Sequence, residues 1–208
     1  LALRSDGRVW AWGWNNHGAV GDGTTIQRHA PVWVAPMTDV VSVAAGAEFS
    51  LALRSDGSVW GWGRNNHGQL GDLTTTDRWS PIQIPEASAI VAIAAGGGHS
   101  LALAGDGKVW SWGRNEFGQL GNGLTNDRPL PFPIVGLDQI VAISAGESHS
   151  MALRADGTVW VWGRNNTGQL GDGTTTNRLT PVLVHHLSQV TAIAAGWGHS
   201  VASRADGT

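Results

Sequence analysis

A tryptophan-rich stretch recurs four times along this chain at a constant spacing of 50 residues. The fourth copy begins at Val159 and reads VWVWGRNNTGQLGDGTTTNR, and close copies begin at Val9, Val59 and Val109. Near its start each copy has two tryptophans separated by one intervening residue, and on a strand this spacing places both indoles on one face. Because a fixed period of roughly 20–50 residues indicates a repeat architecture, we expect repeats at 1–50, 51–100, 101–150 and 151–200, and the start of a fifth at 201–208.

Four short strands are expected within each period. Two strand-like runs flank an Asp-Gly pair, as at Asp56 and Gly57, which is typical of a hairpin with a type I′ turn. A run that contains a proline, such as the one led by Pro181, is expected at the outer edge, where a missing N–H removes no ladder bond. An apolar run without alternation, such as Ile90 to Gly96, predicts the innermost strand.

A long loop rich in glycine, asparagine and threonine separates the second tryptophan from the proline-containing run. Its apolar residue, Leu70 in the second repeat, is expected to plug into the sheet. The arginine that ends the loop, Arg78 in the same repeat, is expected to donate a fork of hydrogen bonds to loop carbonyls.

These segments together predict an all-β fold. Four short strands per period, tight turns and the absence of helical periodicity indicate a β-propeller of four-stranded antiparallel blades, with four repeats of 50 residues present. Indoles buried between neighbouring blades are expected to carry most of the stability.

Composition excludes several classes of function. Thirteen basic and sixteen acidic residues give a net charge of −3 without a block of like charge, and Lys108 is the single lysine, so no nucleic-acid partner is expected. No run approaches the roughly 20 apolar residues of a membrane helix, so no membrane partner is expected either. The absence of cysteine fits a reducing cytosol and a secreted protein equally well. The first residues look like the interior of a repeat, so the natural N-terminus is expected to lie outside this sequence.

The repeat resembles a known family. Its pattern, Ala-Gly-x-x-His-Ser-Leu-Ala-Leu-x-x-Asp-Gly-x-Val-Trp-x-Trp-Gly-x-Asn-x-x-Gly-Gln-Leu-Gly, is similar to that of the regulator of chromosome condensation family over essentially the whole chain. The resemblance implies a propeller that typically has seven blades, so the chain is expected to form a partial ring. Similar proteins include a Ran nucleotide exchange factor, a plant ultraviolet photoreceptor and a bacterial β-lactamase inhibitor. Because its repeats are nearly identical to one another, the chain most resembles bacterial members of the family.

The motif of the photoreceptor and the surface of the exchange factor do not carry over to this chain residue by residue. The photoreceptor motif Gly-Trp-Arg-His-Thr has one partial match, at residues 196–200, which lacks the arginine. No motif diagnostic of the exchange factor's surface is found. Fold alone does not choose among these functions.

Recurring polar residues are interpreted as structural. His99, His149 and His199 occupy equivalent positions, where a metal site is the alternative to histidines that bond backbone near the turn; Phe49 at the fourth position cannot bind a metal. The adjacent pair at residues 185–186 is expected on solvated surface. Asp22 invites a calcium interpretation, but the ligand spacing of calcium loops is missing and loop hydrogen bonding is favoured.

No catalytic residue, metal or cofactor is therefore predicted. The serine that follows each histidine or Phe49 recurs in every unit and has no triad relation to the histidine. Recurrence in every unit favours an architectural role over that of a unique nucleophile.

Residues that differ between repeats are better candidates for a binding site, because scaffolding must repeat whereas a site for an asymmetric partner must not. The turn after Ala-Gly and the long loop are expected to leave the blade from the same face. Aromatic and acidic side chains on such a face are typical of a protein-binding surface. The candidates are Trp14, His17, Glu48, Phe49, Glu116, Phe117, Glu147 and Trp197. Ordinary surface drift between copies is the alternative.

These observations predict a non-enzymatic interaction scaffold that binds a protein partner through one propeller face. Two alternatives stay open: a regulator of a small GTPase that acts like a nucleotide exchange factor, and structural repeat material without a site of its own.

Four blades would leave two apolar edges bare. A homodimer that completes an eight-bladed ring is therefore expected.

Overall fold

The computed structural model describes residues 1–87 and 89–208, which form seventeen β-strands. These residues contain no helix, and therefore none that could cross a membrane. All strand pairings among them are antiparallel. The predicted all-β fold is confirmed.

The strands fall into four groups that recur about every 50 residues. The innermost strands are β4 (Val40–Ala45), β8 (Ile90–Ala95), β12 (Ile140–Ala145) and β16 (Val190–Ala195). The second strands are β1 (Ala2–Leu3), β5 (Phe49–Arg54), β9 (His99–Ala104), β13 (His149–Arg154) and β17 (Ser200–Arg204). The third strands are β2 (Val9–Gly13), β6 (Val59–Gly63), β10 (Val109–Gly113) and β14 (Val159–Gly163). The fourth strands, at the outer edge, are β3 (Arg28–Trp33), β7 (Arg78–Gln83), β11 (Arg128–Pro133) and β15 (Arg178–Leu183).

The sheets are offset from the sequence repeats. Three sheets are complete, with strand orders β4-β5-β6-β7, β8-β9-β10-β11 and β12-β13-β14-β15. Each takes its innermost strand from the end of one period and its other three strands from the next period. The remaining strands form a three-stranded sheet, β1-β2-β3, and a two-stranded sheet, β16-β17.

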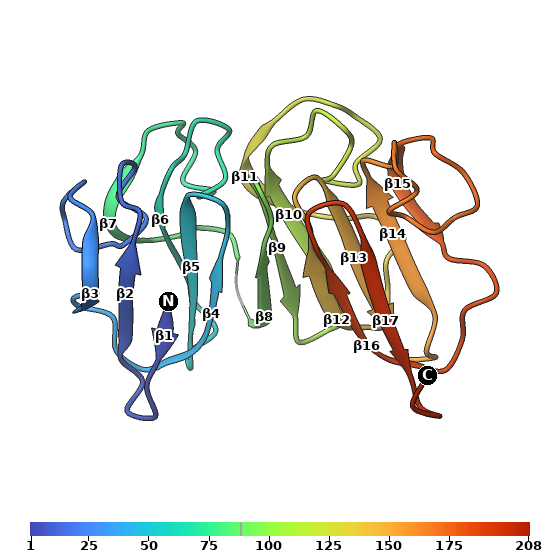
Figure 1. The fold of residues 1–208 in the computed structure, drawn as a ribbon, viewed down its shortest axis with the longest axis horizontal. Helices are drawn as coiled ribbons and strands as arrows, with labels where there is room; N and C mark the ends of the chain where they lie inside the picture. The colour runs from blue at the N-terminus through green and yellow to red at the C-terminus, as the bar shows by residue number, and fades with distance from the viewer. Residues whose placement is uncertain (88) are drawn as a thin grey trace.

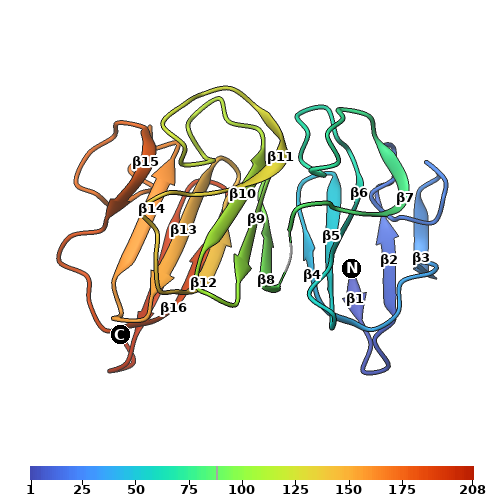
Figure 2. The ribbon, with the colours of Figure 1, turned by 180° about the vertical axis from the view of Figure 1, so that it is seen from behind.

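The sheets stand side by side in chain order, from β1-β2-β3 at one end to β16-β17 at the other (Figures 1 and 2). The innermost strands contact one another in sequence, β4 with β8, β8 with β12 and β12 with β16. The proline-containing strands lie at the outer edges, as predicted. This arrangement is an arc of propeller blades around a shared axis.

The Asp-Gly hairpins form, but their turn differs from the predicted type I′. In the second repeat Gly57 has a φ of 79° and donates its N–H to the carbonyl of Arg54 at 3.0 Å, whereas Ser55 and Asp56 keep negative φ. A three-residue connection of this kind needs a left-handed conformation at its last residue only. The Asp56 carboxylate instead accepts the N–H of Ser58 at 2.9 Å.

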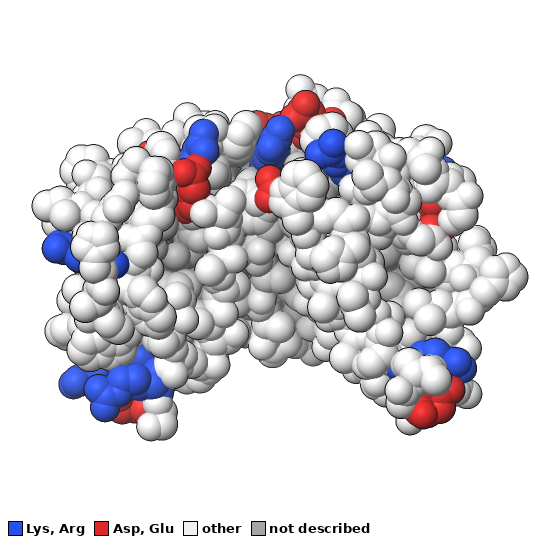
Figure 3. Space-filling model, viewed as in Figure 1, with Lys and Arg blue, Asp and Glu red and all other residues white. Residues whose placement is uncertain are grey.

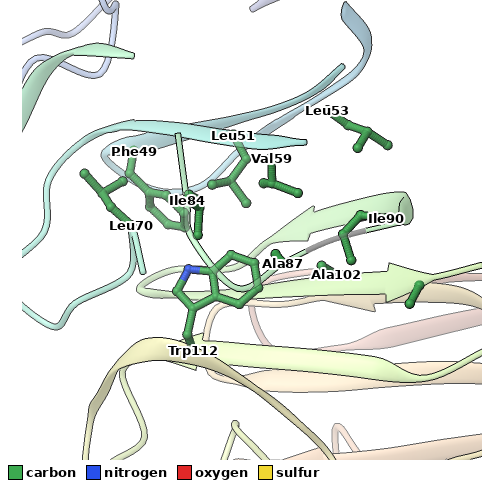
Figure 4. Close-up of a cluster of buried hydrophobic side chains, with 11 residues drawn as sticks. Phe49, Leu51, Leu53, Val59, Leu70, Ile84, Ala87, Ile90, Ala102 and Trp112 are labelled. Carbon is green, nitrogen blue, oxygen red and sulfur yellow. The ribbon is translucent and has the colours of Figure 1, made fainter. Parts of the chain in front are cut away.

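The tryptophan pairs connect each sheet to the one before it. In three of the four pairs the second indole (Trp62, Trp112, Trp162) is fully buried, and the first indole packs against the same cluster. Figure 4 shows Trp112 of β10 pointing toward Leu51, Leu70 and Ile84 of the preceding sheet. The prediction that both indoles face one side is confirmed, and Leu70 is buried as predicted.

Gly71 makes room for the Trp112 indole. Its φ of 69° lies in the left-handed region, and a Cβ there would lie 2.9 Å from Nε1 of Trp112. A residue with a side chain would therefore meet both backbone strain and a steric clash. The glycines of the long loop are thus part of the packing between sheets.

Candidate functional site

One end of the arc is built from two kinds of loop. The turns after the innermost strands are residues 46–48, 96–98, 146–148 and 196–199, and the long loops after the third strands are residues 14–27, 64–77, 114–127 and 164–177. The N–H of Arg64 donates to the carbonyl of Glu48 at 2.9 Å, which ties the two kinds together. We call this end the loop face. Both kinds of loop leave from the same face, as predicted, and the Asp-Gly turns lie at the opposite end (Figure 1).

A buried asparagine organises each long loop. The Asn65 side chain donates to the Asp72 carboxylate at 2.9 Å and to the carbonyls of Thr74 and Thr76, both at 3.1 Å. It also accepts the N–H of Leu70 at 2.9 Å. These bonds satisfy loop groups that cannot join a sheet ladder, so the loops hold a defined shape without regular secondary structure.

The arginine that ends the loop bonds a carboxylate in the first, second and fourth repeats, which corrects the predicted bonds to carbonyls. Nε of Arg78 donates to Asp72 at 2.7 Å. In the third repeat Asn122 replaces the aspartate, and the Arg128 guanidinium lies 4.5 Å from the centre of the Phe132 ring. An anionic acceptor binds a guanidinium more strongly than a neutral carbonyl does.

The equivalent aspartate of the fourth repeat is held ionised. Burial opposes ionisation of Asp172, but hydrogen bonds from Arg178 and Thr174 outweigh it and lower the pKa of Asp172 to about 2. In the first repeat the carboxylate of Asp22 accepts bonds from Arg28 and Thr24. The loop-hydrogen-bond interpretation of these aspartates is confirmed.

Seven of the eight candidate residues lie on the loop face. Trp14 is 58% exposed at the N-terminal end of the arc, and Trp197 is 76% exposed beside the central axis, where Glu147 also lies. Phe117 lies near two guanidinium groups, with its ring centre 5.9 Å from Cζ of Arg114 and 5.0 Å from Cζ of Arg164.

The remaining acidic and histidine candidates form contacts with one another or with arginines. Nδ1 of His17 lies 2.7 Å from Asp77, and Nε2 of His17 lies 3.8 Å from Glu48. Glu48 forms an ion pair with Arg64. Glu116 forms one with Arg114.

Phe49 is the exception, because its side chain is 1% exposed and belongs to the core between two sheets. It stands at the position of His99 and His149, which are also buried. That shared position was a signal that the side chain points inward. Phe49 is therefore removed from the candidate surface.

Sequence reasoning missed the arginines of the loop face. Arg64, Arg114 and Arg164 recur at one position of the repeat, so a search for residues that differ between repeats passes over them. In Figure 3 blue and red side chains alternate along the upper edge, over the loops of this face. The face therefore combines exposed indoles with charges of both signs.

The buried histidines link neighbouring sheets. Nε2 of His99 lies 2.9 Å from Oγ of Ser150, and that hydroxyl donates to the carbonyl of Gln119 at 2.9 Å. The serine hydrogen is thus committed to the carbonyl, so the histidine nitrogen is the donor in the first bond. His99 and His149 bond a serine side chain of the next sheet rather than the backbone expected from the sequence, whereas His199 is exposed.

Burial also fixes the protonation of these rings. Loss of solvation, with a smaller effect of His149, lowers the pKa of His99 to about 3, and burial, with His199, lowers the pKa of His149 to about 4. Both rings are neutral at pH 7. Among the described residues no three metal-ligating side chains come together, and the rings of His185 and His186 lie 6.4 Å apart on the exposed surface.

Fold and loop geometry define an open arc of propeller blades with a polar and aromatic loop face. The RCC1-like domain model matches residues 1–208, and the chain belongs to this family. No curated protein matches the chain.

Three solved structures show the same arrangement. Human WBSCR16 has 29% sequence identity and a TM-score of 0.88 over 97% of this chain and 54% of its own. Saccharomyces cerevisiae Prp20p, described with its binding to Gsp1p and histones, has 26% identity and a TM-score of 0.85 over 96% and 52%. Yeast RCC1 (Prp20) with Kap60 bound has 28% identity and a TM-score of 0.84 over 99% and 52%. The chain thus spans about half the length of these relatives.

Proposed function

We propose that the chain binds a protein partner through the loop face and catalyses no reaction. The observation that carries this proposal is the distribution of variable residues. The apolar positions that recur between repeats fill the sheets and their interfaces, whereas the variable aromatic residues Trp14, Phe117 and Trp197 lie on one face. Large aromatic side chains beside arginines are the residues that most often carry the binding energy of protein interfaces.

The proposal is tested by alanine substitution of Trp14, Phe117 and Trp197 together, with capture of partners from a lysate of the source organism and identification by mass spectrometry. We expect the triple variant to lose a partner that the unmodified chain captures. The control is Val135→Ala, because this side chain is 92% exposed between β11 and β12, away from the loop face. Equal loss of the partner in both variants, or in neither, would contradict the proposal.

A second candidate function is regulation of a small GTPase. It is supported by the similarity to Prp20p, which is described with its binding to Gsp1p. The test is release of a labelled guanine nucleotide from a panel of small GTPases. Acceleration of release by the chain would favour this function over a passive scaffold.

A third candidate is structural repeat material without a site of its own. It would be supported if the triple variant kept every partner that the unmodified chain captures.

We also propose that the chain comes from a bacterium, because its four repeats are nearly identical to one another.

We also propose that a second copy of the chain packs against the open ends of the arc. At one end Trp12 of β2 is 47% exposed, whereas the equivalent Trp62 is buried and donates to the carbonyl of Ala19 at 2.9 Å. At the other end a groove of about 430 Å³ is lined mainly by apolar residues, among them Val161 and Leu170. The proposed contact places the exposed Trp12 indole of one copy in this groove of the other copy.

The dimer is tested by light scattering in dilute solution. We expect about twice the chain mass of 21.8 kDa and a return to monomer in the Trp12→Asp variant. A mass near 21.8 kDa together with a cooperative thermal transition would overturn the proposal.

A further inference from the structure

A cavity of about 340 Å³ opens on the loop face between the sheet β4-β5-β6-β7 and the sheet β8-β9-β10-β11. Its charged or titratable lining residues are Glu48, Arg64, His67, Arg114 and Glu147. The cavity is therefore polar, unlike the groove at the end of the arc. The equivalent position one repeat earlier indicates which chemical group this cavity can bind.

At that earlier interface a glutamate fills the space. The Glu48 carboxylate forms an ion pair with Arg64 and lies 3.8 Å from Nε2 of His17. Asp77 orients the same imidazole through Nδ1 at 2.7 Å. The chain thus contains its own example of a carboxylate held between an arginine and an aspartate-bound histidine.

Fifty residues later the surroundings recur and the glutamate does not. Nδ1 of His67 lies 2.7 Å from Asp127, which repeats the contact of His17 with Asp77. Arg114 stands at the position of Arg64, but Gly98 stands at the position of Glu48. A Cβ built on Gly98 would lie 3.4 Å from Cβ of Arg114 and 3.8 Å from Cδ2 of His67. The missing side chain leaves a space bordered by both groups.

We propose that this cavity binds a carboxylate, supplied by an acidic side chain of the protein partner. The inference rests on the proposed function, because it adds one specific contact to the loop face. The incoming carboxylate takes the place that Glu48 fills one repeat earlier, against the guanidinium of Arg114 and beside the imidazole of His67. Arginine is suited to this role because its planar fork of donors matches a carboxylate.

The other charges around the cavity set the strength of this contact. Arg64 is already neutralised by Glu48. Arg114 pairs with Glu116, whose side chain is exposed and does not line the cavity. Glu147 lies over Gly97 at the cavity wall, forms no ion pair among the described residues and repels an incoming anion. Removing the negative charge of Glu147 is therefore expected to strengthen binding of the carboxylate.

The site is tested with a fluorescein-labelled hexaglutamate peptide, measured by anisotropy at low salt, with a hexaglutamine peptide as the uncharged comparison. We expect hexaglutamate to bind the unmodified chain, Arg114→Gln to weaken binding at least tenfold, and Glu147→Gln to strengthen it. Arg4→Gln is the control for net charge, because Arg4 is exposed at the Asp-Gly turn between β1 and β2, away from the loop face. Equal weakening by both arginine variants would overturn the proposal.

A second variant restores the missing side chain. Gly98 lacks a positive φ and has ordinary van der Waals space for a Cβ, so Gly98→Glu is expected to fold and place its own carboxylate in the cavity. It should abolish hexaglutamate binding and raise the thermal midpoint, whereas Gly98→Gln should block binding without that rise. Hexaglutamate binding that persists in Gly98→Glu would overturn the proposal.

Two further outcomes separate the alternatives. Unlabelled glutarate is expected to displace the peptide, whereas its uncharged diamide at the same concentration and ionic strength is not, and equal displacement by both would overturn a carboxylate site. Failure of hexaglutamate to bind would remove this site while leaving capture of the partner through Trp14, Phe117 and Trp197 untouched. Failure of capture with intact peptide binding would remove only the proposed function.

Discussion

The indole N–H of Trp112 donates a hydrogen bond to the carbonyl of Gln69 at 2.8 Å, across the boundary between two sheets. The same carbonyl accepts the hydroxyl of Ser100 at 2.8 Å. Equivalent indole bonds join Trp62 to Ala19 and Trp162 to Gln119. Each of the three complete sheets is thus joined to the preceding one by a buried indole ring and by the hydrogen bond of its N–H.

Trp112→Ala is expected to lower the free energy of unfolding by about 3–5 kcal/mol, because it removes a fully buried indole and leaves a cavity. Denaturant titration followed by circular dichroism measures the change. Trp12→Ala is the matched control in a monomeric sample. Its half-exposed ring has no preceding sheet to pack on, so the cost should stay below about 1 kcal/mol. Equal costs would contradict the assignment of stability to the interfaces.

Gly71→Ala is expected to destabilise the fold more than Gly168→Ala. Both glycines have positive φ, which costs about 1–2 kcal/mol for alanine. Only Gly71 faces an indole, so its variant should lose about 1–3 kcal/mol more through steric overlap with Trp112. Thermal unfolding of the two variants separates backbone strain from the clash. A larger loss of stability for Gly168→Ala would show that steric overlap with the Trp112 indole does not determine the cost of substitution.

Stability is expected to fall as the pH is lowered from about 6.5 to 4. The folded-state pKa values of His99 and His149 are about 3 and about 4, below the ordinary value of about 6.5. In this window the unfolded chain binds protons that the folded chain does not, so stability increases with pH. Thermal midpoints across the window measure the slope.

His99→Phe is expected to flatten this slope, because Phe49 already fills the equivalent position in the second strand of another sheet. The exposed His185 provides the control, since His185→Gln should leave the slope unchanged. His149 should keep part of the slope, but a slope unchanged in His99→Phe would assign the acid sensitivity to groups other than His99.

Asp72→Asn is expected to cost about 1.5–3 kcal/mol, because it removes a charge-assisted bond to Arg78. The long loop should keep its path, since Asn122 serves at the equivalent position and still accepts the side-chain N–H of Asn115 at 3.1 Å. The reverse change, Asn122→Asp, should stabilise the third repeat by drawing Arg128 from Phe132. Urea unfolding of both variants checks the two signs, and a gain from Asp72→Asn would contradict the role of the ion pair.

The sequence was sufficient to predict the strands, their order in each sheet and the common face of the loops, because period, tryptophan spacing and turn residues all act locally. It was insufficient for the turn type at Asp56, because the number of residues in the connection decides which of them is left-handed. Phe49 was assigned to the surface because it differs between repeats, although its place on the strand points inward.

Other features arise from contacts between repeats. The pairing of His67 with Asp127 joins residues 60 positions apart on neighbouring sheets. The space at Gly98 becomes visible only when both sheets are in place. No pattern within a single period contains this information.

The offset between sheets and sequence repeats has a consequence for synthesis on the ribosome. Because β4 is made before β5, β6 and β7, a sheet is complete once its outer strand emerges, yet the face that receives Trp112 stays bare until β10 follows. The nascent chain therefore always ends in an unfinished surface that only the next stretch of translation can cover. Growth of the arc is directional, and a pause between two periods would expose apolar surface to chaperones at a predictable length.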